Sequence, residues 1–256
     1  MRGRVSTMES SRLATKDVGH SFQPQCETCS LNNLCLPLAV ANEDLGLLEE
    51  IIDRGRPLHR GDHVFRAGDT FDAVYAVRSG TVKSYSVTSA GEEQIIGFHM
   101  PGEIFGLGGL SSGQHPTGAL ALETSAVCRI PFDDIEPLSR RIPSLQRHLF
   151  NLMSREIQED QQLMLLLSKK TAEERIASLL LSLSSRLRRR GLSGSRFRLP
   201  MSRSDMGNYL GLVVETVSRV LTRMQQNEIL RVQGREVEIL APDTLAALAG
   251  TRWQDS

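Results

Sequence analysis

The 256-residue chain is predicted to adopt an α+β fold, in which an antiparallel β-roll precedes a long helix and a C-terminal pair of helices with a hairpin. Three observations predict it. Short alternating apolar runs separated by turn residues fill residues 57–131. A heptad pattern of apolar residues follows Pro143. Two short helical patterns then meet at Gly211 and lead into an alternating segment.

The composition is that of an ordinary soluble globular protein, with 40% hydrophobic and 23% charged residues. The length allows two domains. The longest apolar run lies near residues 163–167 and is far shorter than the ~20 residues that a membrane-spanning helix needs. The N-terminus has no apolar core before a small-residue cleavage site. We therefore expect a cytoplasmic protein with no membrane association.

The charges are distributed unevenly along the chain. Residues 1–168 hold 15 Lys and Arg against 21 Asp and Glu, whereas residues 169–256 hold 15 against 9. The C-terminal third is therefore basic, as is typical of a nucleic-acid-binding module. A solvated charged face gives the same pattern, so charge alone leaves both interpretations open.

The segment of residues 57–131 alternates in the manner of β-strands. Runs such as AVYAVRSG and TVKSYSVT are separated by turns about every ten residues, and Gly80 and Gly91 stand where strand reversals need permissive dihedral angles. We expect a β-roll that serves as a sensor or binding domain. Before it, residues 43–54 fit an amphipathic helix.

The helical pattern after Pro143 has the spacing of a coiled-coil seam. The apolar residues that keep this spacing are Phe150, Met153, Ile157, Met164 and Leu167. Asp160 fills the remaining position, so a two-chain association would bring two carboxylates together in an apolar seam and oppose dimerisation. We interpret Ile157 and Asp160 as a dimer switch. In the alternative interpretation, Asp160 faces solvent and the helix packs on its own domain.

A further helix is predicted from Lys169, where Thr171 and Glu174 form a capping-box pair. Residues 202–224 then contain a short helix capped by a serine, a glycine turn and a second helix. The following segment, ILRVQGREVEIL, alternates around Gly234 and predicts a two-stranded hairpin. Together these elements predict a winged helix-turn-helix.

The second helix of this pair starts near Val214 and places Glu215, Ser218 and Arg219 on one face. A carboxylate accepts from cytosine, a guanidinium donates twice to guanine, and a hydroxyl contacts either base type. The alternative is an i, i+4 salt bridge worth roughly 0.2–0.5 kcal/mol. The preceding turn and the basic context favour recognition of DNA bases by this face. We expect Arg231 and Arg235 of the following hairpin to contact DNA phosphates.

Three of the four cysteines fall within CETCSLNNLC, at Cys26, Cys29 and Cys35, and the fourth is Cys128. Thiolates are the soft ligands of zinc and iron-sulfur clusters. A reducing cytosol disfavours disulfides, and isolated cysteines also serve as small buried hydrophobes. The pattern predicts a four-thiolate site and leaves zinc and iron-sulfur open.

An enzymatic site is not predicted. A cupin-like metal site would need paired histidines on strands, and the histidines of the β-roll segment are dispersed; they are His59, His63, His99 and His115. No nucleophile and base stand in a recognisable arrangement, and no phosphate-binding loop is present. We therefore expect a protein that is not an enzyme.

The segments CETCSLNNLC, RSGTVKSY, LLLSKKTAEER and NYLGLVVETVSRVLTR resemble FNR-type anaerobic regulators of the CRP/FNR superfamily, from about residue 20 onward. The resemblance implies a cyclic-nucleotide-binding-like sensor domain with its cysteine loop at residues 21–140. It also implies a dimerisation helix at 141–168 and a DNA-binding domain at 169–256. Residues 1–20 carry Ser, Arg, Gly and Thr without periodicity, so we expect a flexible leader there.

The resemblance also implies an oxygen-labile 4Fe-4S cluster, a homodimer, and activation or repression of anaerobic genes at palindromes with TTGAT half-sites. Asp160 matches the family's inhibitory aspartate. Strands around residues 79–88, with Gly91, match positions that contact RNA polymerase. The implied cluster ligands are Cys26, Cys29, Cys35 and Cys128. The implied base-reading residues are Glu215, Ser218 and Arg219.

The chain departs from the cyclic-nucleotide-binding branch of this superfamily. Pro116 and Thr117 replace the Arg-Ser pair that holds the phosphate, and Leu107 replaces the glutamate that binds ribose. A cyclic phosphate without a guanidinium partner is poorly held, so no cyclic nucleotide is expected. Val214 stands where that branch carries an arginine, which implies a different half-site.

Overall fold

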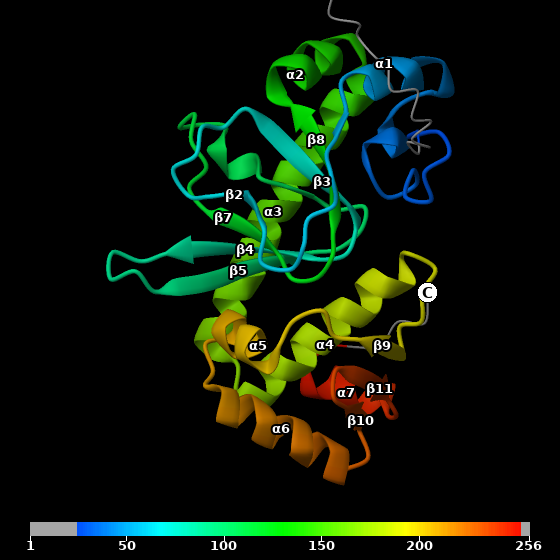
Figure 1. Ribbon diagram of the computed structural model, residues 1–256. Coiled ribbons are helices and arrows are strands. Elements are labelled where there is room, and N and C mark those ends of the chain that lie inside the picture. The colour runs from blue at the N-terminus through cyan, green and yellow to red at the C-terminus, as the bar shows by residue number, and fades with distance from the viewer. Residues whose placement is uncertain (1–24, 252–256) are drawn as a thin grey trace, which may run out of the picture.

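The computed structural model describes residues 25–251, and the leader expected at residues 1–20 lies outside this range. The chain forms a β-roll followed by two helices and then a helix-rich C-terminal part, which lies below the roll in Figure 1. The predicted α+β architecture of β-roll, long helix and winged helix-turn-helix is confirmed.

The β-roll consists of two four-stranded antiparallel sheets, with strand orders β1-β8-β3-β6 and β2-β7-β4-β5. Buried aromatic residues fill the space within it, among them Phe65, Tyr75 and Phe105. The bounds are β1 Asp53–Arg54, β2 His63–Phe65, β3 Ala73–Ser79, β4 Val82–Val87, β5 Glu93–His99, β6 Ile104–Phe105, β7 Gly118–Ala121 and β8 Ala126–Pro131, with a 3-10 helix η3 at Leu107–Gly109.

The segment before the roll contains less α-helix than the sequence predicted. It forms the 3-10 helices η1 (Leu36–Ala39) and η2 (Asn42–Asp44) and the helix α1 (Leu45–Glu50). The predicted helix over residues 43–54 is therefore wrong at its C-terminal end. The reason is tertiary, because Asp53 and Arg54 leave the helix and pair with β8.

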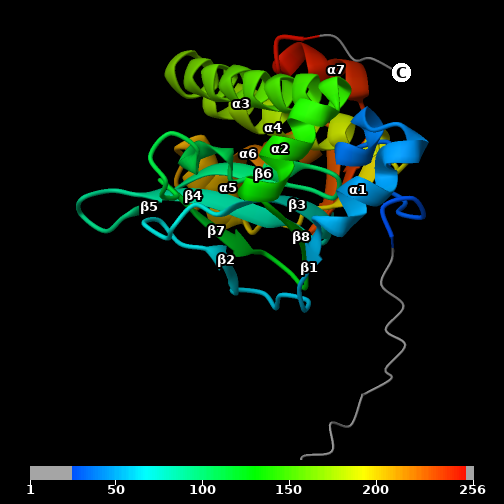
Figure 2. The ribbon, with the colours of Figure 1, turned by 90° about the horizontal axis from the view of Figure 1, so that it is seen from above.

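Two helices follow the roll, and only the second was predicted. The helix α2 (Phe132–Arg141) has two aspartates in its first turn and two arginines in its last, which complements the helix dipole. The long helix α3 (Pro143–Lys169) begins at Pro143 as expected. It lies along one side of the β-roll (Figure 2).

The C-terminal part contains the predicted helix-turn-helix. The helices of this part are α4 (Ala172–Arg188), α5 (Arg203–Leu210), α6 (Val214–Gln226) and α7 (Pro242–Leu248), and α5 and α6 form the helix-turn-helix. The capping box of Thr171 and Glu174 is formed, and Ser202 caps α5 in a second one. Gly211 has a φ of 62°, a left-handed conformation that glycine adopts without a steric penalty.

The wing is a three-stranded sheet in the order β10-β11-β9. The predicted hairpin around Gly234 is β10 (Leu230–Gln233) with β11 (Glu236–Ile239). The strand β9 (Arg196–Arg198) adds to β11 and was not predicted. It comes from the basic loop before the helix-turn-helix, and it pairs only because the chain folds back on the hairpin.

The β-roll and the C-terminal part share one hydrophobic cluster. Ile95 and Phe98 of β5 and the neighbouring Met100 are buried together with α4, α5 and α6. Polar contacts surround this junction, since Asn208 of α5 accepts the backbone N–H of Ile95 through Oδ1 and donates to the carbonyl of Glu93. The two parts therefore pack against each other directly.

Candidate cysteine site and DNA-binding surface

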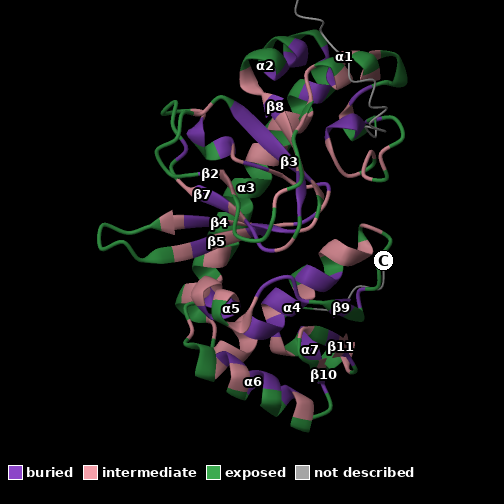
Figure 3. Ribbon diagram, viewed as in Figure 1, coloured by how far each residue is buried: buried purple, intermediate pink, exposed green. Residues whose placement is uncertain are grey.

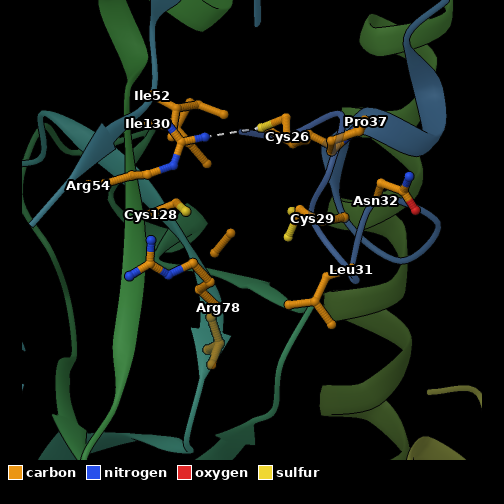
Figure 4. A pocket seen from close by; sticks show the side chains of 14 residues that line it. Cys26, Cys29, Leu31, Asn32, Pro37, Ile52, Arg54, Arg78, Cys128 and Ile130 are labelled. Carbon is orange, nitrogen blue, oxygen red and sulfur yellow. Dashed lines mark hydrogen bonds between the residues drawn. The ribbon is translucent and has the colours of Figure 1, made fainter. Parts of the chain in front are cut away.

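The four cysteines line one cavity between the N-terminal loop and the β-roll (Figure 4). Cys26, Cys29 and Cys35 come from the loop before α1, whereas Cys128 comes from β8. All four are free thiols. Cys128 is paired with Arg54 of β1 in the sheet register, so the site joins a loop to the rigid body of the roll.

Short-range hydrogen bonds give the loop its shape. The N–H of Cys29 donates to the carbonyl of Cys26 at 3.3 Å, and the N–H of Cys35 donates to that of Leu31 at 3.0 Å. Leu36, the next residue, is fully buried and anchors the loop in the core. The loop thereby turns its three thiols toward β8.

Arg54 and Glu49 form a half-buried polar network beside Cys26. The Nη2 of Arg54 donates to Glu49 Oε2 at 2.9 Å and lies 3.5 Å from Cys26 Sγ. The backbone N–H of Cys26 donates to Glu49 Oε2 at 2.7 Å. Sequence reasoning missed both residues. Their only signal is a pair of opposite charges that flank the apolar Ile51 and Ile52.

Burial controls the protonation of these thiols. It raises the pKa of Cys26 to about 12, with a further contribution from Glu49, and it raises the pKa of Cys35 to about 12. Burial also raises the pKa of Cys128. The thiols of Cys26, Cys35 and Cys128 are therefore protonated at neutral pH, and a bound cation would have to displace those protons.

The donor set fits a thiolate-held group in its chemistry. Within residues 25–251, no three His, Cys, Asp or Glu side chains are grouped closely enough to hold a single metal ion. The four thiols instead stand around the walls of the shared cavity. Four thiols on the walls of one cavity are a donor set that fits a thiolate-held zinc ion or iron-sulfur cluster in its chemistry.

The long helix α3 exposes an apolar stripe. Phe150, Ile157 and Met164 are 58%, 59% and 69% exposed, and Leu145 is the one buried residue in the described part of α3. Asp160 is exposed among them. The other two residues of the predicted seam, Met153 and Leu167, are half-buried, and Met153 packs against a hydrophobic cluster of the β-roll. Most of α3 is exposed or half-buried (Figure 3).

The predicted base-reading residues lie together on α6, at the end of the molecule away from the β-roll (Figure 1). Glu215 and Arg219 are exposed and Ser218 is half-buried. Arg219 donates to Thr216 Oγ1 at 3.1 Å, and Ser218 accepts from Arg203 at 3.2 Å. The opposite face of α6 is buried; its buried residues are Val217, Val220, Leu221 and Met224.

A shallow groove beside α6 adds one cation, Arg223, that sequence reasoning did not single out. Thr216, Arg219 and Arg223 line it, and Arg223 pairs with Glu173 of α4 at 2.7 Å. On the wing, Arg231 pairs with Glu238.

The interior of the β-roll is filled with side chains. His115 is buried and stacks on Phe65 with ring centroids 3.8 Å apart. His99 accepts or donates a hydrogen bond with Ser84, and burial lowers the pKa of His99 to about 4, so it is neutral. Leu107 is buried beside this region.

Comparisons with known proteins define the class. Residues 56–141 match the model of the cyclic nucleotide-binding domain, and residues 174–248 match the model of the Crp-like helix-turn-helix domain. A β-roll joined to this DNA-binding domain defines a transcription regulator and not an enzyme. Within the described residues, none of the helices is long and apolar enough to cross a membrane.

Relatives of high identity specify the family. The chain is 58% identical over 228 residues to the transcriptional activator protein Anr of Pseudomonas protegens, covering 89% of this chain and 93% of the relative. It is 49% identical over 225 residues to the fumarate and nitrate reduction regulatory protein of Salmonella typhi, covering 88% and 90%. The structure of FixK2 from Bradyrhizobium japonicum matches with a TM-score of 0.69 and 31% identity, covering 80% and 100%. The chain belongs to the CRP/FNR family, in its FNR-type group.

Proposed function

We propose that the protein is an oxygen-responsive transcription regulator that holds a 4Fe-4S cluster on Cys26, Cys29, Cys35 and Cys128. The observation that carries the proposal is the convergence of every cysteine in the chain on one cavity. A bound cluster would supply an oxygen-sensitive link between the loop and β8.

Packing offers a route from the cysteines to the long helix. Cys35 and Cys128 lie against the same hydrophobic cluster as Met153 of α3, and Leu36 of the loop is part of that cluster. Closing the loop on β8 would therefore change the support of α3 on its inner side. Cores respond to such changes because they are close-packed.

The exposed stripe of α3 is the surface that we assign to homodimerisation. A second copy would cover Phe150, Ile157 and Met164 and would bring the two Asp160 carboxylates together. We propose that the closed loop favours a packing of α3 that tolerates this repulsion. When the loop is released, the repulsion separates the subunits.

Two-fold symmetry then explains DNA recognition. Each α6 would read one half-site through Glu215, Ser218 and Arg219, and two half-sites on one scaffold raise affinity through effective concentration. We expect palindromic sites with TTGAT half-sites. Separated subunits lose this gain, so oxygen would lower DNA affinity and change the expression of anaerobic genes.

Two further elements of the proposal concern other partners. The hairpin of β4 and β5, which includes Gly91 and projects from the roll in Figure 1, is the surface that we assign to RNA polymerase. Pro116 and Thr117 offer no cation to a cyclic phosphate, and Leu107 offers no carboxylate to the ribose. We therefore propose that the β-roll does not use a cyclic nucleotide.

The test is the purification of the full chain without oxygen. We expect a broad visible absorption band, about four iron and four sulfide per chain, and loss of the band together with the dimer when air is admitted. A colourless protein that contains zinc and binds DNA equally well with and without air would contradict the proposal. It would instead favour a zinc-stapled regulator.

A further inference from the structure

The long helix is linked to the DNA-binding part by the short joint Lys170–Thr171, and one arginine spans it. Arg175, on the first turn of α4, donates through Nε to the carbonyl of Lys170 at 2.9 Å. Its Nη1 donates to the carbonyl of Leu210 at 2.8 Å, and its Nη2 donates to that of Leu167 at 2.8 Å. One guanidinium therefore contacts α3, the joint and α5.

The carbonyl oxygens of Leu167 and Leu210 need a hydrogen-bond donor from outside their own helices. Leu167 lies in the last turn of α3 and Leu210 is the last residue of α5, and the final carbonyls of a helix have no partner within it. Both helix ends carry partial negative charge, which a guanidinium neutralises. Arg175 thus caps two helices at once, and its planar fork suits this task better than an ammonium group.

The contact at Leu210 lies at the turn of the helix-turn-helix. The next residue, Gly211, also lies beside Arg175 and Leu167, since a Cβ added to it would make ordinary van der Waals contact with Arg175 Nη1 at 3.4 Å and Leu167 Cδ2 at 3.7 Å. Leu212 and Val213 connect Gly211 to α6. The direction of α6 is therefore tied through Arg175 to the end of α3.

We propose that Arg175 is a positioning residue that fixes α6 relative to the dimer helix and so sets the half-site spacing that the dimer accepts. The inference rests on the proposed function, namely dimeric binding to a palindrome. Dimers of this type read half-sites about one helical turn apart, near 34 Å. One inserted base pair moves a half-site by about 3.4 Å and rotates it by roughly a tenth of a turn, which a rigid joint rejects and a loose joint tolerates.

The experiment compares Arg175→Gln and Arg175→Lys with the full-length wild type in the absence of oxygen. Arg189→Gln is the matched control, because Arg189 is exposed at the end of α4 and its loss changes the charge by the same amount. Fluorescence anisotropy measures binding to a palindrome of native spacing, to palindromes lengthened by one or two base pairs, and to a single half-site. Sedimentation and thermal unfolding report dimerisation and folding.

We expect both Arg175 variants to lose about tenfold in affinity for the native palindrome and to lose most of the preference for native over lengthened spacing. Half-site affinity and the dimer fraction should stay at the wild-type level, and the Arg189 control should match the wild type throughout. A merely structural role would lower the unfolding temperature without changing the spacing preference.

The proposal is overturned if a folded, dimeric Arg175 variant keeps the wild-type spacing preference, or if half-site affinity falls as much as palindrome affinity. If Arg175→Gln does not fold, the Arg175→Lys variant provides the test, because lysine keeps the charge and cannot donate to all three carbonyls at once. If the wild type binds the palindrome no better than one half-site, dimeric recognition itself is refuted. The positioning role proposed for Arg175 then fails with it.

Discussion

Glu103 joins the β-roll to the DNA-binding part, and its replacement by glutamine offers a quantitative test of that junction. Its carboxylate accepts from Arg186 Nε at 2.8 Å and from Arg190 Nη2 at 2.7 Å, and a second contact from Arg186 is shorter still. The N–H of Met100 also donates to it. The side chain of Arg190 is only 6% exposed, so the network is largely shielded from water.

The expected loss follows from the pKa. Burial alone raises the pKa of Glu103, but Arg186, Arg190 and the Met100 N–H outweigh burial and lower it from 4.5 to about 2. A shift of that size corresponds to about 3 kcal/mol of stabilisation. Glu103→Gln removes this contribution and leaves two guanidinium groups without their counter-charge.

The pH dependence has a definite sign. Because the folded pKa lies below the unfolded value, the stabilisation is complete above about 4.5 and is lost as the pH falls toward about 2. Urea unfolding followed by circular dichroism should therefore show a constant difference between wild type and Glu103→Gln near neutral pH. That difference should shrink as the solution is acidified below about pH 4.5.

Glu136→Gln provides the control for this measurement. Glu136 pairs with Arg140 on an exposed face of α2, where the two side chains are 47% and 70% exposed, and such pairs contribute about 0.3–0.5 kcal/mol. The reasoning is refuted if Glu103→Gln destabilises the protein no more than Glu136→Gln, or if its effect is the same at pH 3 as at pH 7.

Three further predictions concern the proposed switch and its output. Asp160→Ala removes the repulsion beside Ile157, so it should sediment as a dimer and bind the palindrome in air; a monomeric, inactive variant would rule out the switch. Cys128→Ser should leave the circular dichroism unchanged but abolish the visible band of anaerobically purified protein, and a retained band would exclude Cys128 as a ligand. Arg219→Ala should cost about 1–3 kcal/mol at one guanine-containing position, measured by binding to single-base variants; a uniform loss across all variants would indicate a phosphate contact instead.

Much of the architecture could be predicted because local signals and the final structure agree. Alternation with turn glycines predicted the β-roll, and the capping box at Thr171 predicted the start of α4. Gly211 predicted the turn before α6 because few other residues tolerate its left-handed conformation. The helix α2 was missed although its terminal charges fit a helix dipole, since Pro137 interrupts the expected pattern.

The cysteine site was predicted only in part. Thiols are rare and chemically distinctive, so the sequence is enough to single out their positions. Glu49 and Arg54 could not be singled out in this way, because acidic and basic residues are common and only the pairing of β1 with β8 brings Arg54 beside Cys26.

Local sequence determined the types of element, the candidate thiols and the exposed face of α6 that we propose reads DNA, because periodicity, turn chemistry and residue type act over a few neighbouring positions. Tertiary structure alone decided which distant groups meet: Cys128 with the loop, Glu103 with Arg186 and Arg190, and Arg175 with the ends of two helices. These contacts join residues up to about a hundred positions apart. They arise from the packing of whole sheets and helices, which no short segment of the chain encodes.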